Sequence, residues 1–276
     1  MMLFFKVFFT EFIAADILGM LVGYLLKNKT PDGMLNTLAF VLMKEKPVMI
    51  EKKGKYGTVY LLQIPDELCF ANLESGMTAL SQDRQEKIRR YAVEQSKLQS
   101  FCCAFLVRVI LQRDFGMTSD QIQVNYLEKG KPVLVDQAGE IVQPHISWSH
   151  SKKAVAVAVN REPVGVDVEW IGVYREKIAR KYFSQTEWEH LEQSDEKEQE
   201  FYKLWTRKEA FVKRNGEGLR KDLSQIPTQL EEMESQRWGE YMVSVCGNAG
   251  TKKWEYCVEE WGKIYPDYYV SKKVDR

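Results

Sequence analysis

Residues Val164–Glu169 have the sequence V-G-V-D-V-E, which predicts the central strand of the fold. The valines alternate with Gly165, Asp167 and Glu169, and a period of two with β-branched residues is typical of a strand with one buried face. Because residues i and i+2 of a strand point the same way, both carboxylates are expected on the face opposite the valines. A hard cation such as Mg²⁺, which prefers oxygen ligands, would offset their mutual repulsion. A solvated face on an edge strand explains the hexapeptide equally well, so these residues alone indicate no function.

A second stretch, Phe201–Leu219, reads F-Y-K-L-W-T-R-K-E-A-F-V-K-R-N-G-E-G-L. Its apolar residues recur at helical spacing, and the two glycines near its end are typical of a helix C-terminus. Trp205, Glu209 and Lys213 follow one another at intervals of four, so they are expected along one side of the helix. Such a helix can direct an acid and a cation into a cleft. An amphipathic helix whose ion pairs face solvent is the alternative.

Taken together, the two stretches closely resemble the signature of the 4'-phosphopantetheinyl transferases of the surfactin-synthetase-activating (Sfp) type. That family usually shows G-[IV]-D-[IV]-E followed by W-[ST]-x-K-E-[AS]-x-x-K-x-x-G-x-G-L, and this chain fills every fixed position of both motifs. The resemblance extends upstream to G-K-P at Gly130–Pro132 and to S-W-S-H-S at Ser147–Ser151. It covers the chain from roughly Thr58 to the C-terminus.

The resemblance implies an α+β fold of two similar halves, related by a pseudo-two-fold axis, with the active site between them. A weak internal repeat, Lys87–Tyr91 against Lys177–Tyr182, agrees with two similar halves. We therefore expect an N-terminal transferase half at residues 57–160 and a C-terminal half with the metal site at residues 161–276. Residues 1–56 are expected to form an N-terminal helical extension, apolar at first and ending in a charged linker.

The resemblance also implies a reaction. Members of the family transfer the 4'-phosphopantetheine arm of coenzyme A to a serine of an apo acyl or peptidyl carrier protein and release 3',5'-adenosine bisphosphate. We therefore expect a Mg²⁺-dependent enzyme, a holo-[acyl-carrier-protein] synthase, with coenzyme A as co-substrate and a carrier protein as partner. Likeness to the Sfp type favours carriers of secondary metabolite biosynthesis, by analogy only. The alternative is a catalytically weakened coenzyme A-binding protein of the same fold.

The motif positions assign roles to individual residues. The resemblance implies that Asp167, Glu169 and Glu209 bind the metal, with two ligands from the strand and the third from the helix. Glu209 and Lys213 are expected to act in catalysis. The residues expected to contact coenzyme A are Arg84, Lys87, Lys131, Ser149, His150, Lys208 and Lys213.

One position departs from the family pattern. Where the family usually carries an arginine that pairs with the adenosine 3'-phosphate, this chain has Gln99. Glutamine lacks both the charge and the two-pronged geometry of a guanidinium. We expect Gln99 to face the adenosine end of coenzyme A and to weaken discrimination against 3'-dephospho-coenzyme A.

The first residues, Met1–Lys29, are strongly apolar but are interrupted by Lys6, Glu11 and Asp16. A membrane span needs about 20 predominantly apolar residues, and each acid near the bilayer centre costs about 2.5–3.5 kcal/mol. A clear basic segment and cleavage site of a signal peptide are absent from the sequence. We favour a packed helix or an appendage outside the catalytic unit, with a membrane-tethered role as the alternative.

Composition bounds the remaining expectations. The chain has 276 residues with 39 basic and 39 acidic side chains, and this balance argues against a dedicated nucleic-acid-binding protein. Its five cysteines lack C-x-x-C spacing, which fits a reducing compartment. We expect a cytoplasmic monomer that binds no nucleic acid.

Overall fold

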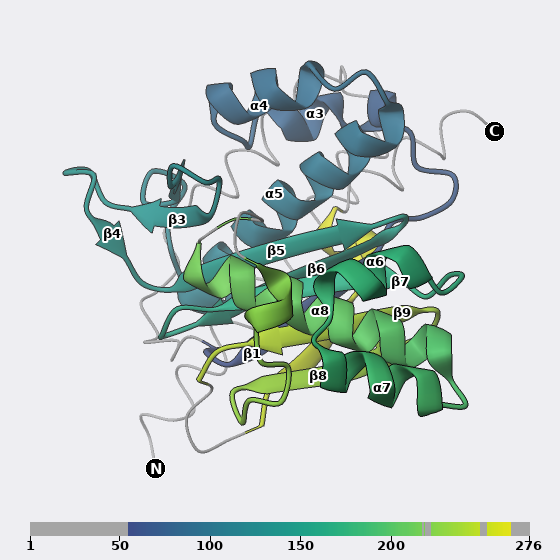
Figure 1. Cartoon of the computed structure of the whole chain (residues 1–276). Helices are drawn as coiled ribbons and strands as arrows, with labels where there is room; N and C mark the ends of the chain where they lie inside the picture. The colour runs from purple at the N-terminus through teal and green to yellow at the C-terminus, as the bar shows by residue number, and fades with distance from the viewer. Residues whose placement is uncertain (1–54, 217, 219–221, 249–252, 266–276) are drawn as a thin grey trace, which may run out of the picture. The chain divides into compact units, whose positions relative to one another are not determined.

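The computed structural model describes residues 55–216, 218, 222–248 and 253–265 (Figure 1). The expected N-terminal extension lies outside the described residues apart from Lys55 and Tyr56. In the described part of the chain, the helices are too short or too polar to cross a membrane.

Two sheets form the centre of the described fold. The first sheet has the strand order β10-β1-β6-β5, with β1 parallel to β10 and antiparallel to β6. The second has the order β7-β9-β8 and is antiparallel throughout. A small third sheet has the order β2-β3-β4. The bounds are β1 Thr58–Gln63, β2 Gln123–Tyr126, β3 Pro132–Val135, β4 Ile141–Val142, β5 His145–Ser151, β6 Ala154–Asn160, β7 Gly165–Trp170, β8 Met233–Trp238, β9 Tyr241–Cys246 and β10 Glu255–Glu259.

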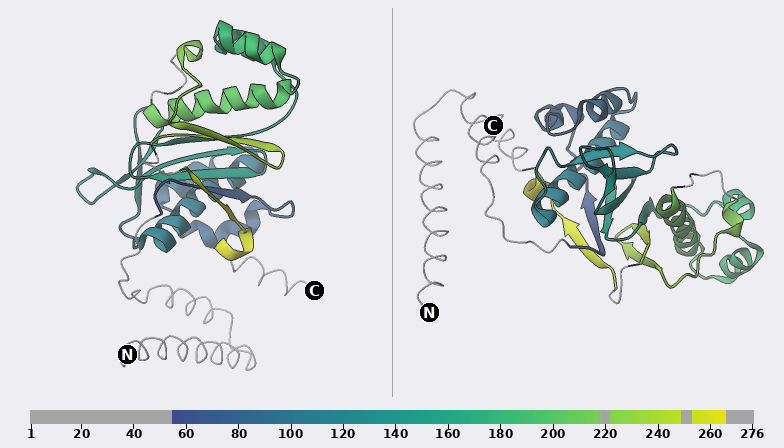
Figure 2. Two further views of the ribbon diagram at one scale, coloured as in Figure 1. Left: turned by 90° about the horizontal axis from the view of Figure 1, so that it is seen from below. Right: turned by 90° about the vertical axis from the view of Figure 1, so that its left-hand side faces the viewer.

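Helices cover the outer faces of both large sheets, as Figure 2 shows from two sides. The long helix α5 packs on β5 and β6, and α8 packs on β7 and β9. Both end at a glycine with a left-handed backbone, Gly116 (φ 66) and Gly216 (φ 70), a conformation that costs glycine little. The helices are α3 Glu74–Met77, α4 Gln82–Arg89, α5 Glu94–Phe115, α6 Glu176–Tyr182, α7 Gln185–Gln193, α8 Lys197–Asn215 and α9 Trp261–Ile264, with 3₁₀ turns at Phe70–Leu73 and Leu223–Gln225.

The inner faces of the two sheets pack against each other. Alternating alanines of β6, Ala154, Ala156 and Ala158, are fully buried against the valines of β7 and β9. Their small side chains allow the second sheet to approach closely. The valines of the V-G-V-D-V-E stretch therefore face this inner core, and Asp167 and Glu169 project from the other face of β7.

The predicted α+β class is confirmed. The pseudo-two-fold relation and the boundary between the two halves stay predictions. One feature of the chain complicates a simple division into halves: β10 comes from the C-terminal region, yet it pairs with β1 in the first sheet. Arg113 at the end of α5 reinforces this pairing through hydrogen bonds to both carboxylate oxygens of Glu259, at 3.0 and 2.8 Å.

Candidate active site

A glycine–alanine contact sets the distance between β7 and α8. A Cβ atom at position 165 would collide with the backbone of Ala210 and Arg214, so only glycine permits this approach. Ala210 is itself fully buried at the contact. The first glycine of V-G-V-D-V-E thus has a physical reason. It lets α8 lie directly on the strand that carries the two acids.

Asp167 stands at the centre of the site and is only 3% exposed. Its Oδ1 accepts hydrogen bonds from the Ser149 hydroxyl at 2.7 Å and from the Lys213 ammonium at 2.7 Å. The same ammonium also donates to Ser149 Oγ at 2.8 Å. Asp167 Oδ2 is buried without a hydrogen-bond partner among the described residues. An unpaired buried oxygen of this kind is costly and is available to a ligand.

Glu169 and Glu209 lie close enough to Asp167 for its charge to raise their pKa values. Burial, followed by the charge of Asp167, raises the pKa of Glu169, whose Oε2 accepts a hydrogen bond from Ser151 at 2.7 Å. Burial, again followed by the charge of Asp167, raises the pKa of Glu209 to about 7. Lys213 opposes both shifts. The structure therefore brings Asp167, Glu169, Glu209 and Lys213 together, and we call these four residues the acidic group.

The oxygen atoms of the acidic group suit the expected Mg²⁺. In the described part of the chain, no three His, Cys, Asp or Glu side chains gather closely enough to form a metal site by themselves. Mg²⁺ commonly takes only one or two protein carboxylates and completes its shell with water and substrate phosphate. The unpaired Asp167 Oδ2 and the two carboxyls with raised pKa values supply hard oxygens that gain from a cation. The carboxyl groups of Asp167, Glu169 and Glu209 are therefore suitable ligands for Mg²⁺.

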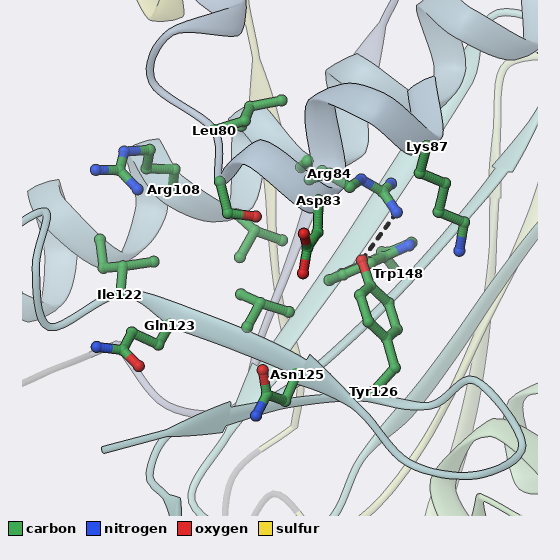
Figure 3. Close-up of a pocket in the computed structure, with 14 residues that line it drawn as sticks. Leu80, Asp83, Arg84, Lys87, Arg108, Ile122, Gln123, Asn125, Tyr126 and Trp148 are labelled. Carbon is green, nitrogen blue, oxygen red and sulfur yellow. Dashed lines mark hydrogen bonds between the residues drawn. The ribbon is translucent and has the colours of Figure 1, made fainter. Parts of the chain in front are cut away.

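A second charged region lies between α4, α5 and β2 (Figure 3). It is a cavity of about 660 Å³ that Arg84, Lys87 and Arg108 line together with two aromatic rings, Tyr126 and Trp148. We call these five residues the basic pocket. Three of them, Arg108 and the two aromatics, were not predicted as site residues, although Trp148 lies within the S-W-S-H-S motif.

Two cations of the basic pocket, Arg84 and Lys87, make cation–π contacts with its aromatic rings. Arg84 donates to the Tyr126 hydroxyl at 2.8 Å and lies 5.5 Å from the ring centroid of Trp148, and Lys87 lies 4.9 Å from that of Tyr126 (Figure 3). Aromatic faces attract cations without neutralising them. Arg84 Nε and the nearby Ser100 hydroxyl are buried without partners among the described residues. Unpaired donors beside two cations favour an anionic ligand.

Comparisons with known proteins identify the family. A family model described as the 4'-phosphopantetheinyl transferase superfamily matches residues 163–271, and one described as the N-terminal region of 4'-phosphopantetheinyl transferase matches residues 69–162. Over 161 residues the chain is 31% identical to the 4'-phosphopantetheinyl transferase Sfp of Bacillus subtilis (strain 168), covering 58% of this chain and 70% of that protein. The chain belongs to the 4'-phosphopantetheinyl transferase family.

Other relatives agree. The transferase is 30% identical to the 4'-phosphopantetheinyl transferase ffp of Bacillus subtilis over 158 residues, which span 56% of this chain and 69% of that protein. It is 26% identical to the 4'-phosphopantetheinyl transferase HetI of a Nostoc species over 186 residues, 64% of this chain and 78% of HetI. The predicted family and the predicted enzyme class are confirmed.

Lys208 is not part of the acidic group, contrary to the expectation that it faces a phosphate. It is 0% exposed, and its ammonium donates to the carbonyls of Leu223 at 2.8 Å and Ile226 at 3.0 Å and pairs with Glu187 at 2.8 Å. An ammonium has three N–H donors, so these partners use all of them. In the transferase Lys208 therefore joins α8 to α7 and to the segment that follows α8.

Lys131 and His150, two residues expected to contact coenzyme A, have different surroundings. The Lys131 ammonium donates to the carbonyl of Arg214 near the C-terminus of α8, where a cation is favoured, and burial lowers its pKa to about 8. His150 comes directly after Ser149 on β5. Burial lowers the pKa of His150, the charges of Lys213 and Arg84 lower it further, and the charge of Asp167 opposes them. His150 thus lies within electrostatic reach of both charged regions.

Gln99 does not face the pocket, which corrects the expectation from the sequence. It is 9% exposed, and its amide donates to the carbonyl of Lys152 at 2.7 Å. Gln95, one helical turn earlier, donates to the same carbonyl at 2.6 Å. Lys152 occupies the turn between β5 and β6 with a φ of 48, a rare conformation for a residue other than glycine. The two glutamines therefore hold a strained turn.

Proposed function

We propose that the enzyme transfers the 4'-phosphopantetheine arm of coenzyme A to a serine of an apo acyl or peptidyl carrier protein. The proposed reaction depends on Mg²⁺ and releases 3',5'-adenosine bisphosphate. The observation that carries the proposal is the acidic group, in which Lys213 pairs with Asp167 and lowers the raised pKa values of Glu169 and Glu209. Family membership supports the same reaction.

Asp167, Glu169 and Glu209 supply the carboxylates that would hold Mg²⁺, with water and substrate phosphate completing the shell of the ion. When bound, the ion would polarise the phosphate oxygens of coenzyme A and neutralise the charge that develops on them. Lys213 already donates to Asp167 and Ser149, and an ammonium has one further N–H to offer. That donor can bind a phosphate oxygen and stabilise its negative charge in the transition state.

The basic pocket would receive the adenosine end of coenzyme A. Arg84 and Lys87 supply positive charge, and Arg84 Nε supplies a buried donor without a described partner. Tyr126 and Trp148 add aromatic surface. These groups match a ligand that combines a flat base with phosphates. His150, between the pocket and the acidic group, lies within reach of a phosphate that spans both.

The alternative is a catalytically weakened coenzyme A-binding protein, which the absence of the usual arginine at position 99 suggests. Gln99 binds the turn at Lys152 and not the pocket, so its identity says little about affinity for the 3'-phosphate. The acidic group also has no use in a protein that only binds. Transfer is therefore favoured over binding alone.

The test is a transfer assay with the full chain, coenzyme A, MgCl₂ and a panel of purified apo carrier proteins. Mass spectrometry should detect the mass of the arm on a carrier serine, and chromatography should detect adenosine bisphosphate in equal amount. Fatty-acid, polyketide and nonribosomal-peptide carriers on one panel decide which class is preferred, including the expected secondary-metabolite carriers. No mass gain on any carrier, with a known transferase active in parallel, would refute the proposal.

The remaining expectations belong to the same proposal. We propose a cytoplasmic monomer that binds no nucleic acid. The cysteines of the described residues are all free thiols, as in a reducing compartment, and the chain carries balanced charge. Light scattering after size exclusion measures the oligomeric state, and cell fractionation measures the location.

A further inference from the structure

Three serines alternate along β5 and face β7. β5 is an edge strand of the first sheet and β7 an edge strand of the second, and the two are not paired in one sheet. The hydroxyls of Ser147 and Ser151 accept hydrogen bonds from the main-chain N–H groups of Val166 and Trp170, both at 3.1 Å. The serine hydroxyls thus accept hydrogen bonds from main-chain N–H groups on the edge of β7 that, among the described strands, is not paired with another strand. We call Ser147, Ser149 and Ser151 the serine row.

Two members of the serine row also bind carboxylates. A hydroxyl has one proton to donate, and its oxygen can accept further bonds. Because Ser151 Oγ accepts from Trp170 N–H, its own proton is directed to Glu169 Oε2, 2.7 Å away. Ser149 repeats the pattern, since it accepts from the Lys213 ammonium and donates to Asp167 Oδ1. Each hydroxyl is oriented by one donor and therefore orients one carboxylate.

We propose that Ser151 is a positioning residue for Glu169 and holds this carboxylate ready to bind the cation. The proposal rests on the proposed function of the acidic group. A glutamate side chain has several rotatable bonds, and fixing one of its oxygens removes freedom that metal binding would otherwise have to remove. Ser151 itself is fixed by the backbone of β7, the strand that carries Glu169. The restraint therefore stays in register with the carboxylate.

Ser147 provides a matched control. It lies on the same strand and the same face as Ser151, and its hydroxyl accepts from a β7 N–H at the same distance of 3.1 Å. Its bond reaches the main chain of Val166 and no carboxylate of the acidic group. Removing the Ser147 hydroxyl disturbs the contact between β5 and β7 without disturbing either acid. A merely structural role of the row predicts equal effects at both positions.

The experiment measures Mn²⁺ binding, with the full chain and coenzyme A present, from the electron paramagnetic resonance signal of free Mn²⁺. We expect Ser151→Ala to weaken Mn²⁺ binding about tenfold, the low end for loss of a group that orients a metal ligand. Ser151→Thr, which keeps a hydroxyl, should restore most of the affinity. Ser147→Ala should lower the unfolding temperature and leave the Mn²⁺ affinity within about twofold of the wild type. If Ser151→Ala is unstable, Ser151→Cys, with similar size and only a weak S–H donor, replaces it.

The outcomes separate the inference from the proposed function. Equal Mn²⁺ affinity for the wild type and both Ser151→Ala and Ser151→Cys would overturn the role of Ser151, even in an active transferase. Equal losses in Ser147→Ala and Ser151→Ala would overturn it too, because a general loosening of β5 would then explain both. Selective loss in the Ser151 variants supports it, even if no carrier protein accepts the arm and the proposed function fails.

Discussion

The acidic group and the basic pocket differ in what surrounds their like-charged side chains. In the acidic group the ammonium of Lys213 pairs with Asp167, and burial together with the charge of Asp167 raises the pKa values of Glu169 and Glu209. In the basic pocket the cations rest on aromatic faces, and the unpaired atoms are buried donors. The first region gains from a cation and the second from an anion. Changes in the first should therefore affect turnover, and changes in the second should affect substrate affinity.

The largest effect is expected at Asp167. Asp167→Asn keeps the shape of the side chain but removes the charge that Lys213 and the proposed cation share. Transfer should fall by about a hundredfold or more, as when other charge-stabilising groups are removed from active sites, while the fold stays intact. Initial rates in millimolar MgCl₂ and a thermal unfolding curve measure both. Rates like those of the wild type would remove the acidic group from the mechanism.

Lys208 is a control on the same helix as Lys213. Lys208→Met breaks the ion pair between the buried Lys208 ammonium and Glu187, whose side chain is 11% exposed. Loss of one partner of a buried pair costs about 3–5 kcal/mol of stability, and the exposure of Glu187 places the expected loss at the low end. Urea unfolding should show this loss, and the folded fraction should keep its kcat. Lys213→Met should do the reverse, with a large loss of kcat and a small change in unfolding. Equal loss of kcat in the two folded variants would contradict the division between structural and catalytic lysines.

The basic pocket is tested at Arg84. Arg84→Gln removes a cation and should raise the KM for coenzyme A by roughly tenfold, because hydrogen bonds to charged groups contribute about 1.5–3 kcal/mol. The KM for 3'-dephospho-coenzyme A should change little, and kcat should not change for either donor. A parallel rise in KM for both donors would mean that Arg84 binds another part of the substrate.

The pH dependence of stability examines Glu209 without any substrate. Its pKa is raised from 4.5 to about 7 in the folded protein, so between these values the folded state keeps a proton that the unfolded chain has lost. The contribution of Glu209 to the stability of the metal-free enzyme should therefore fall as pH rises from about 5 to 7. Unfolding temperatures in chelator should decline less steeply for Glu209→Gln than for the wild type. Identical declines of the unfolding temperature with pH in the two proteins would show that the pKa of Glu209 is not raised in the folded state.

The smallest effect is expected at Gln99. Since its amide holds the carbonyl of Lys152, Gln99→Arg should leave the ratio of KM values for coenzyme A and its dephospho form within about twofold of the wild type. A modest drop in unfolding temperature should accompany it. A lower KM for coenzyme A alone would mean that the side chain does reach the 3'-phosphate and that the turn contact is dispensable.

Much of the acidic group could be predicted from the sequence because its signals are local. The period of two places Asp167 and Glu169 on one face of a strand, and the interval of four places Glu209 and Lys213 on one side of a helix. Gly165 and Ala210, both motif positions, explain why the two elements touch. The expected Mg²⁺ and the precise ligand set stay predictions.

Helical periodicity also predicts that Lys208 is buried and does not face a phosphate. Lys208 lies four residues after Leu204 and four before Val212, on the buried face of α8. Motif resemblance outweighed that periodicity. Gln99 shows the same limit on α5, where it lies among buried residues and finds its partner in a turn far along the chain.

The sequence by itself determined β7, α8 and the chemistry of the acids, because these follow from periodicity and from side-chain type within a few residues. The α+β class followed from the family resemblance of the motifs. Tertiary structure alone decided which groups surround Arg84 and Lys87, what the serines of S-W-S-H-S bind, and the partners of Lys208 and Gln99. Those features depend on contacts between α4, α5, β2 and β5, or between β5 and β7. Such contacts form where sheets and helices pack, and packing is set by the shapes of many distant side chains at once. No local pattern records them.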